Sequence, residues 1–143
     1  MARALAEARA AADRGEVPVG AVLVDARGTI LAADGNRTLA GPDPSAHAEL
    51  LVIRQGAQRL GSQRLIGCDL YVTLEPCAMC AAVISFARIR RLYFGAEDEK
   101  GGAVVSGPRF FAQPSCHHRP EVYEGLRAAE AAALLRQFFA NRR

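Results

Sequence analysis

Two short motifs near the middle of the chain contain residue types that bind metal ions and move protons. The first is His47-Ala48-Glu49, and the second is Pro76-Cys77-Ala78-Met79-Cys80. Two thiolates three positions apart on the first turn of a helix share one face, and a histidine from a neighbouring helix can complete a Cys2His set. The motifs therefore predict one zinc ion per chain, bound by His47, Cys77 and Cys80, with a water or hydroxide in the fourth position.

Glu49 stands beside this predicted metal site and is suited to acid–base chemistry. A zinc ion with two thiolate ligands is formally neutral and acidifies water weakly, so the reaction needs a base. We expect burial to raise the pKa of Glu49, which then takes a proton from water and delivers it to the substrate. Residues two apart on a helix do not face each other, so His47 is predicted in the first turn, with the metal beyond the helix end.

Each motif has a simpler interpretation when it is taken alone. A single histidine is commonly a surface or core residue, and a Cys-x-x-Cys pair can be a redox pair or half of a structural zinc site. A structural site requires a fourth protein ligand, for which Cys68, Cys116 and His117 are candidates. Cys68 and Cys116 are otherwise expected to be small buried residues. A second metal site at Cys116, His117 and His118 is disfavoured, because adjacent residues rarely bind one ion well.

The two motifs together are more specific than either alone, since His-x-Glu with Pro-Cys-x-x-Cys is the signature of zinc-dependent nucleobase deaminases. The charge distribution is compatible with a nucleic-acid substrate. Residues 73–143 contain ten basic against seven acidic residues and account for the whole net charge of +3. Such an excess suits contact with phosphates, and it suits a plain solvated surface as well.

The elements that must position these motifs alternate between helix and strand. The predicted helices cover residues 2–13, a segment that Asp43-Pro44-Ser45 can cap and Gly61 can end, a segment from Pro76 to 87, and 126–141. The predicted strands cover residues 17–24, 29–33, 70–74, 89–94 and a short segment at 103–105. This order implies one antiparallel hairpin followed by parallel crossovers. We predict an α/β fold, a three-layer α/β/α sandwich around a five-stranded mixed sheet, with ligands bound where strands end and helices begin.

Length and composition exclude several classes of protein. The 143 residues are half hydrophobic and 23% charged, which predicts one globular domain over residues 1–143 and excludes wholesale disorder. No run approaches the ~20 apolar residues of a membrane span, and the first fifteen residues include Arg3, Glu7, Arg9, Asp13 and Arg14. Four cysteines are too few for a disulfide scaffold. We therefore expect a cytoplasmic protein without a membrane partner.

Stretches in and around the two motifs resemble bacterial tRNA-specific adenosine deaminases, within the cytidine deaminase-like superfamily. These stretches are 16–22, 35–37, 43–49, 70–75, 94–98, 100–102 and 134–139. The zinc motifs alone mark only the superfamily, whereas the flanking stretches point to the tRNA enzymes. The resemblance implies a cytidine deaminase-like fold, a homodimer, and hydrolytic deamination of the wobble adenosine of an arginine tRNA to inosine, with release of ammonia.

The resemblance also assigns substrate-binding roles. It implies that Asn36 and the backbone of Ala48 read the flipped base, while Asp98 and Lys100 lie near the sugar and the flanking strand. Phe139 is implied to line the groove for neighbouring bases, although core packing explains one of Phe138 and Phe139 equally well. Residues 104–119 differ from the family pattern, so the resemblance does not extend to contacts with the tRNA stem.

The implied partner is a tRNA anticodon stem-loop, because an adenine inside a stacked stem cannot reach a metal at the end of a sheet. Binding to such a partner is expected to weaken steeply with salt. Two alternatives stay open. A deaminase of free nucleobases or nucleosides, of the guanine or cytosine type, would share the zinc motifs and differ in the pocket. A noncatalytic RNA-binding module with structural zinc would need a fourth protein ligand.

Overall fold

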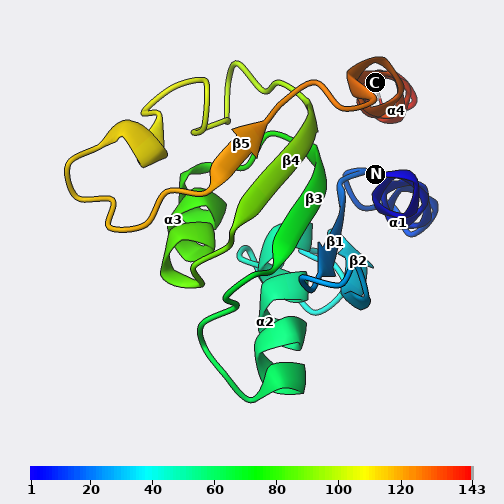
Figure 1. Ribbon diagram of the computed structural model, residues 1–143. Helices are drawn as coiled ribbons and strands as arrows, with labels where there is room; N and C mark the ends of the chain where they lie inside the picture. The colour runs from blue at the N-terminus through cyan, green and yellow to red at the C-terminus, as the bar shows by residue number, and fades with distance from the viewer. Residues whose placement is uncertain (143) are drawn as a thin grey trace.

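The computed structural model describes residues 1–142 and contains one five-stranded sheet between two pairs of helices (Figure 1). In chain order the elements are α1 (Ala2–Asp13), β1 (Gly20–Val24), β2 (Ile30–Gly35), α2 (Ala48–Leu60), β3 (Asp69–Leu74), α3 (Ala78–Phe86), β4 (Arg91–Ala96), a 3-10 turn (Phe110–Ala112), β5 (Glu121–Tyr123) and α4 (Ala128–Ala140). Helices α1 and α4 cover one face of the sheet, and α2 and α3 lie on the other. The predicted three-layer α/β/α sandwich around a mixed sheet is confirmed.

The strand order β2-β1-β3-β4-β5 brings the two predicted motifs to the same end of the sheet. Strand β1 runs antiparallel to both β2 and β3, whereas β3, β4 and β5 are parallel. The β1–β2 hairpin closes through Asp25, whose carboxylate accepts the N–H groups of Arg27 and Thr29 at 2.9 Å each. The β3-α3-β4 crossover then places the start of α3 just beyond the carboxyl end of β3.

The predicted position of the fifth strand was wrong. Residues 103–105 form no strand, because the N–H groups of Val104 and Val105 donate to the carboxylate of Glu75 instead of to a neighbouring strand. The fifth strand is Glu121–Tyr123, which pairs in parallel with β4 at the edge of the sheet. All three of its residues are exposed, so it has no buried face that could produce an apolar pattern.

The start of α2 also differs from the prediction. His47, in an extended conformation, is the N-cap residue, and Ser45 hydrogen-bonds Asp43 instead of capping the helix. The cap comes from the residue just after β2, where the side-chain oxygen of Asn36 accepts the Ala48 N–H at 2.9 Å. The helix ends as predicted at Gly61, which has a φ of 63°.

Helix α3 likewise begins later than predicted. Pro76 was expected at the first helical position, but Cys77 is the N-cap residue and the helix starts at Ala78. The proline therefore lies outside the helix and joins it to the end of β3, and its carbonyl accepts the N–H of Ala103 at 2.9 Å.

Helix α1 packs on the sheet with direct backbone contact. A Cβ atom added to Gly20 would lie 2.0 Å from the Ala4 carbonyl oxygen and 2.5 Å from the Ala8 nitrogen. Such distances are far inside van der Waals contact, so only glycine allows this approach of helix and strand. On the opposite face the core is formed by fully buried aliphatic side chains, among them Leu23 and Val52.

The three tyrosines of the chain form one stack across the parallel part of the sheet. Tyr71, Tyr93 and Tyr123 are direct neighbours in the register of β3, β4 and β5. Their ring centroids are 4.4 Å apart between Tyr71 and Tyr93, and 5.0 Å apart between Tyr93 and Tyr123. Stacking of this kind stabilises neighbouring strands and helps to hold the short β5 in place.

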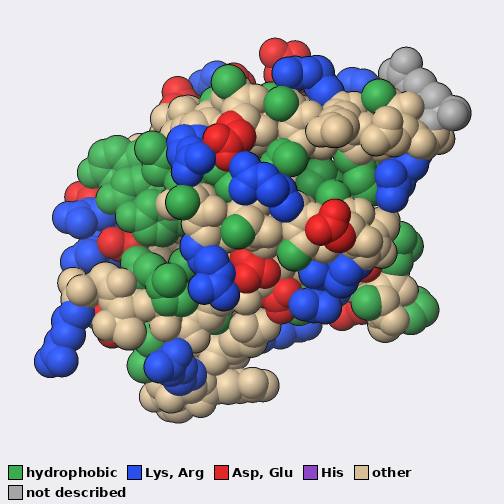
Figure 2. All heavy atoms as spheres, turned by 90° about the vertical axis from the view of Figure 1, so that its right-hand side faces the viewer, with side chains coloured by type: hydrophobic (Ala, Val, Ile, Leu, Met, Phe, Trp, Pro, Cys, Tyr) green, Lys and Arg blue, Asp and Glu red, His purple; other side chains and the backbone are tan. Residues whose placement is uncertain are grey.

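The face of the molecule on the side of α1 and α4 carries basic and acidic side chains interspersed (Figure 2). Arg9 of α1 forms an ion pair with Glu130 of α4 at 2.7 Å and links the two helices. An exposed pair of this kind contributes little to stability. Within residues 1–142, no helix has the length and apolar character needed to cross a membrane.

Candidate active site

Three potential metal ligands meet where α2 and α3 begin. His47 and Cys77 are the N-cap residues of these helices, and Cys80 lies in the first turn of α3. Nδ1 of His47 is 3.6 Å from the Sγ atom of each cysteine, and the ligand atoms all lie within 4.8 Å of one another. His47 is thus placed one residue before the first helical turn in which it was predicted.

The spacing of these atoms fits a zinc ion. Zinc bonds of about 2.3 Å to sulfur and about 2.0–2.1 Å to nitrogen, at a tetrahedral angle, place the two ligand atoms about 3.5–3.6 Å apart. Both nitrogen–sulfur distances in the structure are 3.6 Å. Within residues 1–142 no fourth histidine, cysteine or carboxylate joins the set. Three protein ligands are the arrangement of a catalytic zinc site, which keeps one position open.

The other two cysteines take no part in this site. Cys68 is buried, and the buried Cys116 packs against Ser85 with 3.6 Å between sulfur and oxygen. The ring of His118 is fixed by a hydrogen bond between Nε2 and the carbonyl oxygen of Ile89 at 2.7 Å. Within the described residues, Cys116, His117 and His118 form no metal-binding group. The simple interpretation of Cys68 and Cys116 as buried residues is confirmed.

The electrostatics of the three ligands favour binding of a cation. The hydrogen bond from Cys80, together with that from His47, lowers the pKa of Cys77 to about 4. The contact with Cys77 raises the pKa of Cys80, because a second thiolate beside the first is repelled. Burial of Cys80 raises its pKa further. The hydrogen bond with Cys77 raises the pKa of His47. A divalent cation removes the repulsion between the sulfurs and replaces the protons shared among these groups.

Glu49 is buried beside the ligands. It is the second residue of α2 and only 4% exposed. Burial raises the pKa of its carboxyl to about 7, with the nearby His47 partly opposing the shift. A carboxyl with this pKa exchanges protons readily at neutral pH, which is what a general acid–base requires.

A cavity of about 340 Å³ opens in front of these groups. Its apolar lining comes from Val17, Val19 and Leu74, and His47, Glu49 and Cys77 also face it. Further polar groups come from Asn36, Thr38, Glu75 and Asp98. Apolar walls with a few convergent polar groups are typical of a site for a flat, partly polar ligand such as a nucleobase.

The predicted substrate-binding residues differ in how near they lie to this cavity. Asn36 lines it, and the Ala48 N–H is engaged by the Asn36 side chain. Asp98 also lines it, and its Oδ1 accepts the N–H groups of Lys100 and Gly101 at 3.2 and 3.0 Å. Lys100 itself is exposed and is not among the lining residues.

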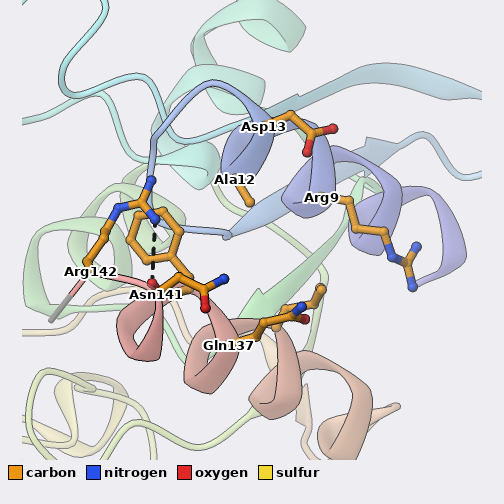
Figure 3. A pocket seen from close by; sticks show the side chains of 8 residues that line it. Arg9, Ala12, Asp13, Gln137, Asn141 and Arg142 are labelled. Carbon is orange, nitrogen blue, oxygen red and sulfur yellow. Dashed lines mark hydrogen bonds between the residues drawn. The ribbon is translucent and has the colours of Figure 1, made fainter.

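Phe139, the remaining predicted residue, projects from α4 outside the cavity and is 51% exposed. Its neighbour Phe138 is buried, so core packing explains that member of the pair. Near Phe138 a hollow of about 490 Å³ lies between the carboxyl ends of α1 and α4 (Figure 3). It is lined by residues such as Arg9, Gln137 and Arg142 and contains none of the metal ligands. The smaller cavity therefore holds the chemistry.

Two buried carboxylates were missed in the sequence, Glu75 in the cavity wall and Glu16, which hydrogen-bonds the cavity residue Thr38. Glu16 accepts the N–H groups of Leu39 and Ala40 at 3.0 and 3.1 Å. Glu75 accepts hydrogen bonds from the backbone at Asp98 and Val104. Burial alone would raise the pKa of Glu75, but these N–H donors outweigh it and lower the pKa. The sequence signal that could have identified Glu75 is its position at the end of a strand, directly before a metal motif.

The fold and this site together define a zinc-dependent deaminase. Residues 1–96 match the sequence model described as the cytidine and deoxycytidylate deaminase zinc-binding region, and the chain belongs to this family. The three ligands form the site of one zinc ion per chain.

Within this class the chain belongs to the tRNA-specific adenosine deaminases. It is 62% identical over 143 residues to the enzyme of Agrobacterium fabrum, covering 100% of this chain and 93% of the relative. It is 44% identical over 140 residues to the enzyme of Rickettsia bellii, covering 97% of each. A solved structure from work on A-to-I editing by tRNA:A34 deaminases matches with a TM-score of 0.93 and 62% identity, over 94% of this chain and 97% of the other. A guanine deaminase from Nitrosomonas europaea matches with a TM-score of 0.78 at 25% identity, over 97% of this chain and 82% of the other.

Proposed function

We propose that this chain converts adenosine to inosine at the wobble position of a tRNA anticodon, in an arginine tRNA, and releases ammonia. The observation that carries the proposal is the buried Glu49 beside the His47, Cys77 and Cys80 set, in a chain 62% identical to a tRNA-specific adenosine deaminase. Residues 1–143 form a single domain for this reaction.

Glu49 moves the protons of the reaction. A bound zinc ion would act as the Lewis acid that makes water a nucleophile at neutral pH. Glu49 takes a proton from the attacking water and delivers it to a ring nitrogen as C6 of the adenine becomes tetrahedral. It then takes the second proton from the hydroxyl group on C6 and transfers it to the amine, so that the C6–N bond breaks, the C6 carbonyl forms and ammonia leaves. Its pKa of about 7 allows it to act as base and as acid in turn.

The remaining cavity residues bind the nucleotide. Val17 and Leu74 supply apolar surface for the faces of the base. The Asn36 oxygen is fixed on the Ala48 N–H, which leaves its amide N–H groups as donors toward the base. The carboxylate of Asp98 is the acceptor for a sugar hydroxyl. The base must be flipped out of the loop to reach this site.

A homodimer and a cytoplasmic location complete the proposal. The outer surface of α3 is apolar and partly exposed, and Phe86 at its end is 68% exposed. A second copy of the chain would bury this surface. Sedimentation equilibrium of the purified protein tests it, and a monomer at all concentrations would contradict the dimer.

Deamination of an anticodon stem-loop, compared with free nucleosides and free guanine, tests the activity. We expect inosine at the wobble position of the stem-loop and no ammonia from the free compounds. The likeness to the guanine deaminase gives the alternative its support. Ammonia from guanine with an unchanged stem-loop would establish that alternative. Inosine mapping in total RNA then identifies the tRNA.

A further inference from the structure

Glu75 lies just beyond the end of β3 and is 2% exposed. Its Oε1 accepts the Asp98 N–H and the Ser106 hydroxyl, both at 2.9 Å. Its Oε2 accepts the N–H groups of Val104, Val105 and Ser106 at 3.0, 2.9 and 3.0 Å. A single buried carboxylate thus binds both ends of the segment from Glu97 to Ser106, which we name the 97–106 loop.

These bonds exclude Glu75 from proton transfer. A carboxylate has about four lone-pair positions, and five donors already occupy the two oxygens. Although Glu75 lines the cavity, no acceptor position is left for a substrate or a water. Its contribution must pass through the loop that it holds.

The loop is closely fitted around this carboxylate. A Cβ atom added to Gly102 would lie 2.4 Å from the carboxyl carbon of Glu75 and 2.5 Å from the Asp98 carbonyl oxygen. That carbonyl also accepts the Gly102 N–H at 2.8 Å. The loop therefore turns directly over the Glu75 carboxylate, and this turn places Asp98 at the cavity wall.

We propose that Glu75 is a positioning residue, which holds the 97–106 loop and through it fixes Asp98 for binding of the substrate nucleotide. The expected effect on kinetics rests on the proposed function. The expected effect on the loop rests on the hydrogen bonds alone. Glu75 determines how well the nucleotide binds, whereas Glu49 moves the protons.

Hydrogen exchange tests the structural part without any activity assay. In Glu75→Gln, the amide N–H groups of Val104 and Val105 are expected to exchange at least tenfold faster, because an amide replaces an acceptor oxygen with a donor. The control is Asp69→Asn, which breaks the half-buried pair with Arg90 at the other end of the same strand. It should leave these amides within twofold of the wild-type rate. Unchanged exchange in Glu75→Gln would overturn the proposal.

Zinc content and kinetics with the stem-loop test the positioning role. For Glu75→Gln we expect one zinc per chain, a KM raised at least tenfold and a kcat within about threefold of wild type. Asp98→Ala should raise KM similarly, and the double variant should be no worse than the worse single variant. Loss of zinc, a fall in kcat at unchanged KM, or multiplied effects in the double variant would each overturn the proposal.

A second substitution covers the case in which Glu75→Gln fails to fold. Gly102→Ala pushes a methyl group against the same carboxylate and should reproduce the faster exchange and the raised KM. Ser106→Ala removes one of the bonds to Glu75 and should give a smaller change in the same direction. Wild-type exchange in both variants would contradict the role of Glu75. Failure of wild-type protein to act on the stem-loop would instead refute the proposed function and leave the exchange result standing.

Discussion

Replacement of Glu49 by glutamine separates proton transfer from metal binding. Glutamine keeps the size of the side chain and its place in the first turn of α2, but it cannot accept and return a proton. Glu49 is not one of the three ligands that lie within 4.8 Å of one another. The Glu49→Gln protein should therefore fold and contain zinc like wild type.

The size of the loss follows from the lack of a substitute base. General acid–base catalysis is worth about 10²- to 10⁴-fold. Glu75 and Asp98 are the other carboxylates of the cavity. Glu75 is fully hydrogen-bonded, and one oxygen of Asp98 already accepts two N–H groups. Since neither can replace Glu49, we expect a loss of at least about 10³-fold, or about 4 kcal/mol in the barrier.

Single-turnover deamination of an anticodon stem-loop measures this loss, with inosine determined at each time and zinc measured in the same samples. The matched control is Glu121→Gln, at a carboxylate of β5 that pairs with Arg91 on the surface. It should retain wild-type activity. A Glu49→Gln protein that contains zinc and retains more than a tenth of the wild-type rate would refute the assignment.

Three further predictions follow from the metal site, the helix–sheet contact and the charge. Cys80→Ala should bind less than a tenth of the zinc that wild type binds. Chelator should lower the thermal unfolding temperature of wild type but not of this variant. An equal effect of chelator on both proteins would contradict the assignment of Cys80 as a ligand. Gly20→Ala should lower the free energy of unfolding in urea by about 3 kcal/mol, because the new methyl group meets the backbone of α1; a loss below about 1 kcal/mol would show that α1 shifts freely. The KM for the stem-loop should rise steeply with salt, and a salt-independent KM would exclude binding through phosphates.

The metal ligands were predictable because their signal is local and chemical. The three-residue spacing of Cys77 and Cys80 needs only one helical turn, and the alternation of helix and strand was enough to bring His47 to the same end of the sheet. The cap of α2 was not predictable in this way. Ser45 has the side-chain type of a cap, but the oxygen that accepts the Ala48 N–H comes from Asn36, twelve residues before Ala48.

The same limit applies to the fifth strand and to Glu75. Val104 and Val105 have the composition of a strand, yet their N–H groups donate to a carboxylate that is about 30 residues away in sequence. No local pattern contains that partner. The strand Glu121–Tyr123 is exposed, and its pairing with β4 depends on the register of the parallel sheet. Such long-range hydrogen bonds determine the conformation of the loop beside the site, whereas local sequence spacing determines which residues can be metal ligands.

The tyrosine stack gives the protein a built-in optical reporter. The chain has no tryptophan, and all three tyrosines lie in the stack across β3, β4 and β5. Its near-ultraviolet circular dichroism therefore arises mainly from one place, which includes none of the metal ligands. Detachment of the edge strand removes Tyr123 from the stack and leaves the Tyr71–Tyr93 pair. A dichroism signal that survives treatment with chelator thus shows that all three strands stay together in the apoprotein.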